Sequence, residues 1–405
     1  MDKKRILFVD DEPNVLQALR RMLRPLRKEW DMSFVDSGEE ALKAMAQQPC
    51  DVIVSDIRMP GMSGVELLEK VRDQYPGTAR IALSGQADNE AIFASVGPVH
   101  QFLSKPCDAE TLKVTVGRAC ALHQLLRAEK LRKLVAQTTA LPSQPAVYND
   151  LVKALQAPDV SLRVVQELIA RDIGMTTKVL QLVNSAFFGI RQHISSVSQA
   201  VNLLGLDIIK ALVISLRIFE QFDPQKLGGL SLDALFDHSM TVGAAAKQIA
   251  RAEKTERPVA DDGFMAGILH DVGKLIIAVR LPEEYKKMRL ASAKSNMPLH
   301  VIEQKVLGAT HAEAGAYLLG LWGLPNNIVE AVAFHHQPAH SMTKAFSSLT
   351  AVHAANALVH DADAENETDT PSLLDTSYVD ALGLSHRLED WRGIVSDVVD
   401  RKEEQ

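Results

Sequence analysis

The stretch RILFVDDEPNVLQALRRML, residues 5–23, decides the fold of the first third of this 405-residue chain. It joins an apolar run that ends in Asp10 and Asp11 to a segment whose apolar residues recur at helical spacing until Pro25. A short apolar run followed by an amphipathic segment is typical of a strand that leads into a helix. The stretch therefore predicts the first unit of an alternating strand–helix domain.

The same alternation continues to about residue 105. Apolar runs that predict strands occur at residues 5–11, 32–37, 51–57, 80–85 and 101–106. Amphipathic segments between them predict helices, and such alternation favours a parallel sheet with helices on both faces. We therefore expect a fold of class α/β plus all-α, in which a five-stranded, doubly wound domain precedes a helical region.

Polar residues stand where the predicted strands end. Asp10 and Asp11 end the first strand, Asp56 the third, Ser84 the fourth and Lys105 the fifth. One aspartate at such a place could simply be a turn residue. Parallel sheets, however, bind ligands beyond the carboxyl ends of their strands. Three carboxylates that converge there repel one another unless a cation joins them, and Mg²⁺ suits oxygen ligands.

These motifs resemble the receiver domain of bacterial response regulators. The matching stretches are ILFVDDEPNVLQALRRML, VIVSDIRMPGMSGVELL, IALSGQAD and FLSKPCD, which cover about the first 120 residues. The resemblance implies that Asp56 accepts a phosphoryl group from a sensor histidine kinase. It also implies that Mg²⁺ is held by Asp10, Asp11, Asp56 and the backbone carbonyl of Arg58.

Three further residues take roles from the same resemblance. Lys105 and Ser84 would contact the phosphoryl oxygens. Phe102 stands where the family has its aromatic switch, although a phenylalanine of the core is the alternative.

Residues 134–340 show helical periodicity and no convincing pair of strands. The stretches VVQELIARDIGMTTKVLQLVNSAFFG, LHDVGKL, HAEAGAYLLGLWGLP and AFHHQP resemble the HDOD domain, a regulatory relative of the HD phosphohydrolases. The resemblance implies an all-helical bundle. We expect a receiver domain at 1–123, a helical linker at 124–140, the HDOD domain at 141–340 and a helical extension with an acidic loop at 341–405.

A His270–Asp271 pair lies inside the apolar run FMAGILHDVGKLII, residues 264–277. A carboxylate and an imidazole are costly to bury without partners. In HD enzymes such a pair binds a divalent metal, and imidazole with carboxylate suits Fe, Mn, Zn or Ni. By resemblance, the ligand candidates are His238, His270, Asp271, His311, His335 and His336, with Lys274 as a phosphate contact.

Two features oppose hydrolysis at this second site. The branch of HD proteins that cleaves cyclic di-GMP has a GYP loop after its histidine pair, whereas this chain reads HHQPAHSMTK. Asn356 stands where the last metal carboxylate belongs, and Asp361 falls on another helical face. Three alternatives remain: hydrogen-bonded core residues, a bound metal without catalysis, and a metal-dependent phosphohydrolase.

The composition gives no sign that the protein binds nucleic acid or spans a membrane. A net charge of −7 gives no basic footprint for DNA or RNA, and no apolar run is long and uncharged enough to span a membrane. The first predicted strand begins directly after MDKK, so we expect no signal peptide. The three scattered cysteines suit a reducing cytosol.

We therefore expect a cytoplasmic response regulator with a non-catalytic HDOD output. It would act on another signalling protein, such as a cyclic-di-GMP enzyme, or on a second copy of itself. The alternatives are a receiver-gated phosphohydrolase acting on cyclic dinucleotides or nucleotide phosphates, and a dinucleotide-binding effector that does not cleave its ligand.

Overall fold

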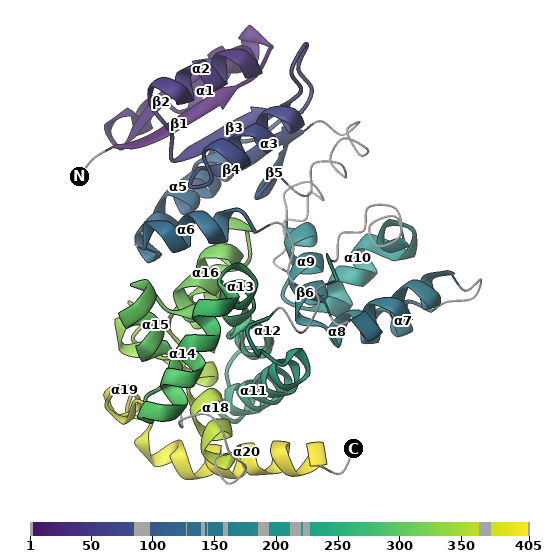
Figure 1. Cartoon of the computed structure of the whole chain (residues 1–405), viewed down its shortest axis with the longest axis vertical. Helices are drawn as coiled ribbons and strands as arrows, with labels where there is room; N and C mark the ends of the chain where they lie inside the picture. Colours follow the sequence, from purple (N-terminus) through teal and green to yellow (C-terminus); the bar gives the residue numbers. More distant parts are fainter. Residues whose placement is uncertain are drawn as a thin grey trace.

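The computed structural model in Figure 1 describes residues 3–84, 98–126, 128–138, 142–143, 145–156, 161–184, 194–210, 220–221, 227–363 and 374–403. The N-terminal part contains a five-stranded parallel sheet in the order β2-β1-β3-β4-β5. Its strands are β1 (Lys4–Val9), β2 (Trp30–Val35), β3 (Val52–Asp56), β4 (Ala79–Ser84) and β5 (Gln101–Ser104). The predicted doubly wound sheet is confirmed.

Helices cover both faces of this sheet: α1 (Pro13–Met22), α2 (Gly38–Gln47), α3 (Gly64–Gln74) and α5 (Ala109–Leu125). Successive residues of a strand point to opposite faces. Accordingly, Ile6 and Phe8 belong to one apolar cluster, and Leu7 and Val9 belong to the other. Burial on both faces explains why the strands read as continuous apolar runs rather than as alternating ones.

The C-terminal part is mainly helical, as expected. Its helices are α6 (Glu129–Ala136), α7 (Pro145–Gln156), α8 (Leu162–Ala170), α9 (Ile173–Asn184), α10 (Val197–Lys210), α11 (Leu232–Ala252), α12 (Arg257–Leu269), α13 (Val272–Arg280), α14 (Pro282–Ser295), α15 (Leu299–Leu307), α16 (His311–Leu321), α17 (Asn326–Phe334), α18 (Ser348–Asp363), α19 (Thr376–Ala381) and α20 (Leu388–Glu403). The expectation of no strand pair here is wrong in one detail. Strand β6 (Pro142–Ser143) pairs in parallel with β7 (Glu220–Gln221), too briefly to leave a pattern in the sequence.

The sheet domain and the helical bundle share one apolar core. The larger cluster runs from Ile6 and Phe8 of β1 through Leu122 of α5 to Leu319 of α16. Helix α5 ends at Leu125, and α6 starts separately at Glu129 between the two parts of the molecule (Figure 1). The two parts therefore meet through packed side chains as well as through the connecting chain.

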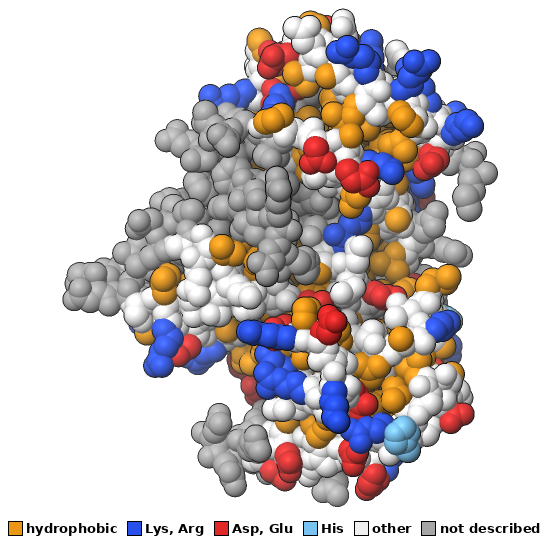
Figure 2. Space-filling model, turned by 180° about the vertical axis from the view of Figure 1, so that it is seen from behind, with side chains coloured by type: hydrophobic (Ala, Val, Ile, Leu, Met, Phe, Trp, Pro, Cys, Tyr) orange, Lys and Arg blue, Asp and Glu red, His pale blue; other side chains and the backbone are white. Residues whose placement is uncertain are grey.

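The surface carries charges of both signs. On the face shown in Figure 2, basic side chains are interspersed with acidic ones over both halves of the molecule. Among the helices that the structure describes, none is long and apolar enough to cross a bilayer.

Candidate functional site

The first candidate site lies at the carboxyl edge of the sheet. Asp10 and Asp11 directly follow β1, and Asp56 is the last residue of β3. Each of these three residues offers a carboxylate oxygen, and the three oxygens lie within 4.8 Å of one another. Lys105, directly after β5, places its Nζ 2.7 Å from Asp10 Oδ2 and 2.9 Å from Asp56 Oδ2. The structure thus brings together four of the predicted residues.

Burial and charge act against each other in this cluster. Burial raises the pKa of Asp56, although hydrogen bonds from Lys105 and from the Ile57 backbone N–H, 2.8 Å from Asp56 Oδ1, partly offset it. Burial also disfavours the Lys105 ammonium, but its hydrogen bonds to Asp10 and Asp56 outweigh that effect and raise its pKa. The lysine is therefore charged and neutralises part of the acidic cluster.

The other receiver residues lie around this edge. Arg58 is two residues beyond Asp56, with an exposed side chain. Ser84 ends β4 in register with Ser104, but its side chain lies outside the described residues. Phe102 of β5 is buried in the apolar cluster that also contains Leu7, which is compatible with both a core role and a switch role.

The second candidate site lies where five helices of the bundle meet. His238 comes from α11, His270 ends α12, and Asp271 caps the start of α13. His311 is the first residue of α16, while His335 and His336 follow α17. Every predicted ligand therefore reaches one region. Two groups place their ligand atoms within 4.8 Å: His238, His270 and Asp271, and His311, His335 and His336.

Three of these rings have one nitrogen occupied by an acceptor outside the cluster. His270 Nδ1 lies 2.6 Å from Gly267 O, His335 Nδ1 lies 2.8 Å from Val332 O, and His311 Nδ1 lies 2.6 Å from Glu303 Oε2. A carbonyl or carboxylate at Nδ1 fixes a proton there, so that Nε2 holds the lone pair whenever the ring is neutral. Metal-binding histidines have this same second contact.

Asp271 lies at the centre of the group. Its Oδ1 is 3.2 Å from His311 Nε2 and 4.0 Å from His335 Nε2, and its Oδ2 is 3.4 Å from His270 Nε2 and 2.7 Å from Lys274 Nζ. Burial alone would raise its pKa, but the charges of His270 and Lys274 and the hydrogen bonds hold that pKa well below the ordinary value. Asp271 is therefore an anion shared by both groups.

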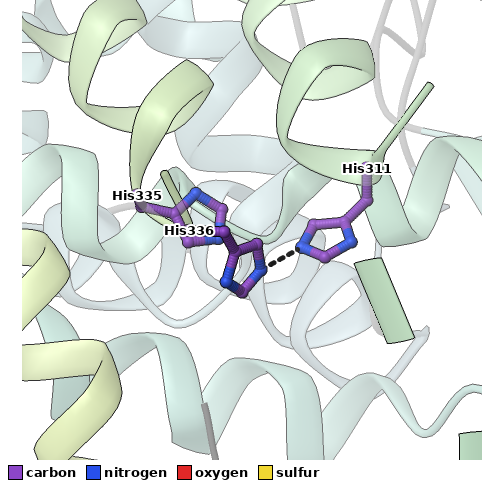
Figure 3. A group of neighbouring side chains, drawn as sticks. All are labelled: His311, His335 and His336. Atoms are coloured by element: carbon purple, nitrogen blue, oxygen red, sulfur yellow. Dashed lines mark hydrogen bonds between the residues drawn. The ribbon is translucent and has the colours of Figure 1, made fainter. Parts of the chain in front are cut away.

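Figure 3 shows His336 turned toward His311, with the Nε2 atoms 3.0 Å apart. The His336 ring also stacks on that of His300, with centroids 4.1 Å apart. Burial lowers the pKa of His335, His336 and His238, so these rings are neutral at neutral pH. For His311, burial is outweighed by Glu303 and Asp271, which raise its pKa to about 9.

The position of the missing carboxylate is filled by an amide. Asn356 of α18 is buried, and its Oδ1 lies 3.1 Å from His238 Nε2. Asp361 is exposed near the end of the same helix, so it does not replace the carboxylate. His360, by contrast, places its ring 4.5 Å from that of His238.

Several buried polar atoms of the described residues at this site have no hydrogen-bond partner, and this shows whether a metal fits there. Among the described residues, four buried atoms of the six predicted ligands lack a hydrogen-bond partner: His270 Nε2, Asp271 Oδ1, His335 Nε2 and His336 Nδ1. Buried polar atoms are nearly always paired, so four orphans in one place need an explanation. Hydrogen bonds between core residues do not supply it, whereas lone pairs of imidazole and carboxylate match the ligand set of a transition metal.

The sequence interpretation did not assign Glu303, His300 or His360 to this site. Glu303 of α15 is completely buried, and besides His311 Nδ1 its Oε2 accepts a bond from the His311 backbone N–H at 2.8 Å. His300 lies against His336. A glutamate in a helical region is usually a surface residue, and only the turn between α15 and α16 brings Glu303 to His311.

Two family models match this chain. The model described as response regulator receiver domain matches residues 6–117, and the model described as HDOD domain matches residues 141–338.

Curated relatives match parts of the chain. An uncharacterized protein of Treponema pallidum is 28% identical over 228 residues, which cover 56% of this chain and 43% of the relative. The hydrogenase transcriptional regulatory protein HoxA of Cupriavidus necator is 34% identical over 178 residues, which cover 41% of this chain and 36% of the relative. The chain thus spans less than half the length of these relatives.

Solved structures resemble the chain as well. The MmoQ response regulator of Methylococcus capsulatus is 23% identical and covers 62% of this chain and 98% of its own, with a TM-score of 0.48. An HDOD domain protein of Geobacter sulfurreducens is 23% identical and covers 69% of this chain and 95% of its own, with a TM-score of 0.40. By its two family matches, this chain is a response regulator in which a receiver domain precedes an HDOD domain.

Proposed function

We propose that Asp56 is the phosphoacceptor of this response regulator. Its Oδ2 attacks the phosphorus of the donor, the bond from phosphorus to the histidine nitrogen of a sensor kinase breaks, and an acyl phosphate remains. Lys105, 2.9 Å from that oxygen, offsets negative charge on the transferred group. Asp10, Asp11, Asp56 and the Arg58 carbonyl would hold Mg²⁺, which supplies further charge neutralisation when bound.

The experiment is phosphorylation by acetyl phosphate with Mg²⁺, read by intact mass. The wild type should gain one phosphoryl group, and Asp56→Asn should gain none, because an amide does not form the acyl phosphate. Asp73→Asn, which changes an exposed aspartate of α3, is the matched control. Normal labelling of Asp56→Asn would reject the assignment.

The HDOD part is proposed to be a non-catalytic output that holds a transition metal, Fe, Mn, Zn or Ni, in its histidine cluster. The four orphaned buried atoms support the metal. Asn356 supports the absence of hydrolysis, because a neutral amide beside His238 stands where a charged ligand would bind an ion more strongly. Lys274 forms a salt bridge with Asp271. It could contact a phosphate only if this salt bridge broke.

Cobalt(II), whose absorption reports imidazole ligation, tests this proposal. Wild-type protein should bind it, and neither wild type nor metal-loaded protein should cleave cyclic dinucleotides. Asn356→Asp should raise cobalt affinity about tenfold or more by adding a charged ligand. Turnover by the wild type would instead support the phosphohydrolase alternative.

The remaining assignments follow from these two. We propose that the chain divides into 1–123, 124–140, 141–340 and 341–405, that Ser84 contacts the phosphoryl group, and that Phe102 responds to it. The kinase partner would be a sensor histidine kinase in the cytoplasm. The output partner would be another signalling protein, such as a cyclic-di-GMP enzyme, or a second copy of the chain.

A further inference from the structure

Two helices carry cluster residues at one end and reach the receiver side at the other. Helix α16 begins at His311 and ends at Leu321, and α13 begins directly after Asp271 and ends at Arg280. At a rise of about 1.5 Å per residue, the eleven residues of α16 span roughly 16 Å. In Figure 1 both helices lie below α6, on the side of the bundle that faces the sheet domain.

The far end of α16 is capped by the receiver. Gln101 of β5 donates from its Nε2 to Leu321 O at 2.9 Å and to Gly320 O at 3.3 Å. The last carbonyls of a helix lack intrahelical partners, so these bonds satisfy atoms that would otherwise be free. A Cβ at Gly320 would lie 2.4 Å from Leu122 Cδ2 of α5, so the glycine permits this close approach.

The far end of α13 is tied to the receiver through α6. Arg280 donates from Nη2 to Gln137 O at 2.8 Å. The neighbouring carbonyl, Ala136 O, accepts a bond of 2.8 Å from Nη2 of Arg80, which is completely buried in β4. The C-terminal end of α6 is thus held between an arginine of the bundle and an arginine of the receiver.

Near the cluster, α13 and α16 are locked to each other. A Cβ at Gly273 would lie only 1.9 Å from His311 O, and a Cβ at Gly315 would lie 3.0 Å from Gly273 N. Thr310 and Glu313 form a capping box that fixes the first turn of α16. Neither helix can therefore shift without moving the other, and a shift of the pair moves Asp271 and His311 together.

We propose that the phosphoryl state of the receiver sets the position of the α13–α16 pair, and thereby the geometry of the histidine cluster, through Gln101 and Arg280. The inference rests on phosphorylation of Asp56 as proposed above. The contacts come from β4, which ends at Ser84, and from β5, which ends at Ser104, directly before Lys105, whose Nζ lies 2.9 Å from Asp56 Oδ2. Coupling of this kind is reciprocal, so occupation of the cluster also changes the affinity of the receiver for its phosphoryl analogue.

The test uses the full chain with Mg²⁺ and beryllium fluoride as the phosphoryl analogue. Two quantities are measured with and without the analogue: amide hydrogen exchange in residues 308–316, and the dissociation constant of cobalt(II). The test variant is Gln101→Ala combined with Arg280→Ala. Its control is Gln17→Ala combined with Arg21→Ala, which removes the same residue types from exposed positions on α1.

In the wild type and the control, the analogue should change the cobalt dissociation constant about fivefold or more and should alter exchange at the start of α16. In the test variant the analogue should change the cobalt dissociation constant and the exchange rate by less than about 1.5-fold. Unchanged exchange in the wild type with the analogue bound, or a full response in the test variant, would overturn the inference. Absence of cobalt binding in every variant would reject the metal site, and the exchange measurement would still decide the coupling.

Discussion

The acidic cluster of the receiver and the histidine cluster of the bundle both pair a lysine with a buried aspartate. They differ in whether their other buried polar atoms have hydrogen-bond partners. In each, a lysine lies 2.7 Å from a buried aspartate, Lys105 from Asp10 and Lys274 from Asp271. Lys105 also contacts Asp56, so one ammonium serves two carboxylates. In the histidine cluster, His336 Nε2 and His311 Nε2 share one hydrogen bond, but four buried atoms of the described ligand candidates have no hydrogen-bond partner.

This difference predicts that the two sites differ in the free-energy cost of the ion-free state. The receiver site is partly exposed, because Asp11 and Lys105 are half-buried, and Lys105 offsets part of its negative charge. Most of the histidine cluster is buried, and without an ion the unpaired atoms of His270, Asp271 and His335 are buried with no partner among the described residues, which is costly. We therefore expect the receiver to bind its ion weakly and the bundle to bind its ion tightly.

Removal of the transition metal should have the largest effect. At a thousandfold excess over its dissociation constant, a ligand stabilises the folded state by about 4 kcal/mol. Stripping the protein with a strong chelator and dialysing it should therefore lower the thermal midpoint of the bundle by several degrees, measured by calorimetry. Readdition of zinc should restore the midpoint, whereas addition or omission of Mg²⁺ should leave it unchanged. Equal thermal midpoints of the bundle with and without zinc would show that the histidine cluster, like the receiver site, is stable without its ion.

Glu303 sharpens the comparison because it supports the ligand candidate His311 from outside the cluster. Its carboxylate holds His311 Nδ1 at 2.6 Å and so directs Nε2 toward Asp271. Loss of such a supporting group typically costs about 10–100-fold in metal affinity. Glu303→Gln should weaken cobalt binding by that factor in an absorption titration. Glu284→Gln, at an exposed site on α14, should not change it. An unaltered affinity in Glu303→Gln would mean that His311 is not a ligand.

The two sites also differ in how far the sequence predicts them. Asp10 and Asp56 could be placed together because parallel strands end at a shared edge, and the apolar runs locate those ends. The histidine ligands come from separate helices, so periodicity alone does not bring His238 near His270, and only the family resemblance grouped them. Asn356 was found in the same way, opposite His238.

Contacts that depend on tertiary packing left no signal in the sequence. Glu303 meets His311 through a turn of the chain, and its helix gives no sign that this side chain is buried. Gln101 caps a helix that ends more than 200 residues later, at Leu321. That contact exists only because the receiver and the bundle pack together, and neither domain pattern contains information about the docking.

The smallest expected effect concerns stability of the receiver. Because burial and Asp10 raise the pKa of Asp56, its ionised form destabilises the fold relative to the protonated form. This cost is present at neutral pH and disappears as the pH falls through the raised pKa to below the ordinary value of 3.8. Asp56→Asn should therefore be more stable than wild type at pH 7 without Mg²⁺, by about 1 kcal/mol or a few degrees.

That gain should shrink under two conditions that remove the same repulsion. Acidification protonates Asp56 in the wild type, and millimolar Mg²⁺ neutralises the carboxylates, so both should bring the two midpoints together in thermal unfolding. Asp73→Asn, where the aspartate is exposed and bonded to Arg72, should show no such gain. If Asp56→Asn proved less stable than wild type at pH 7, the bonds from Lys105 and Ile57 would outweigh the burial of its charge. The ionised Asp56 carboxylate would then be fully stabilised by its hydrogen bonds. The receiver site would differ even more from the histidine cluster, where buried nitrogens of the described residues have no hydrogen-bond partner.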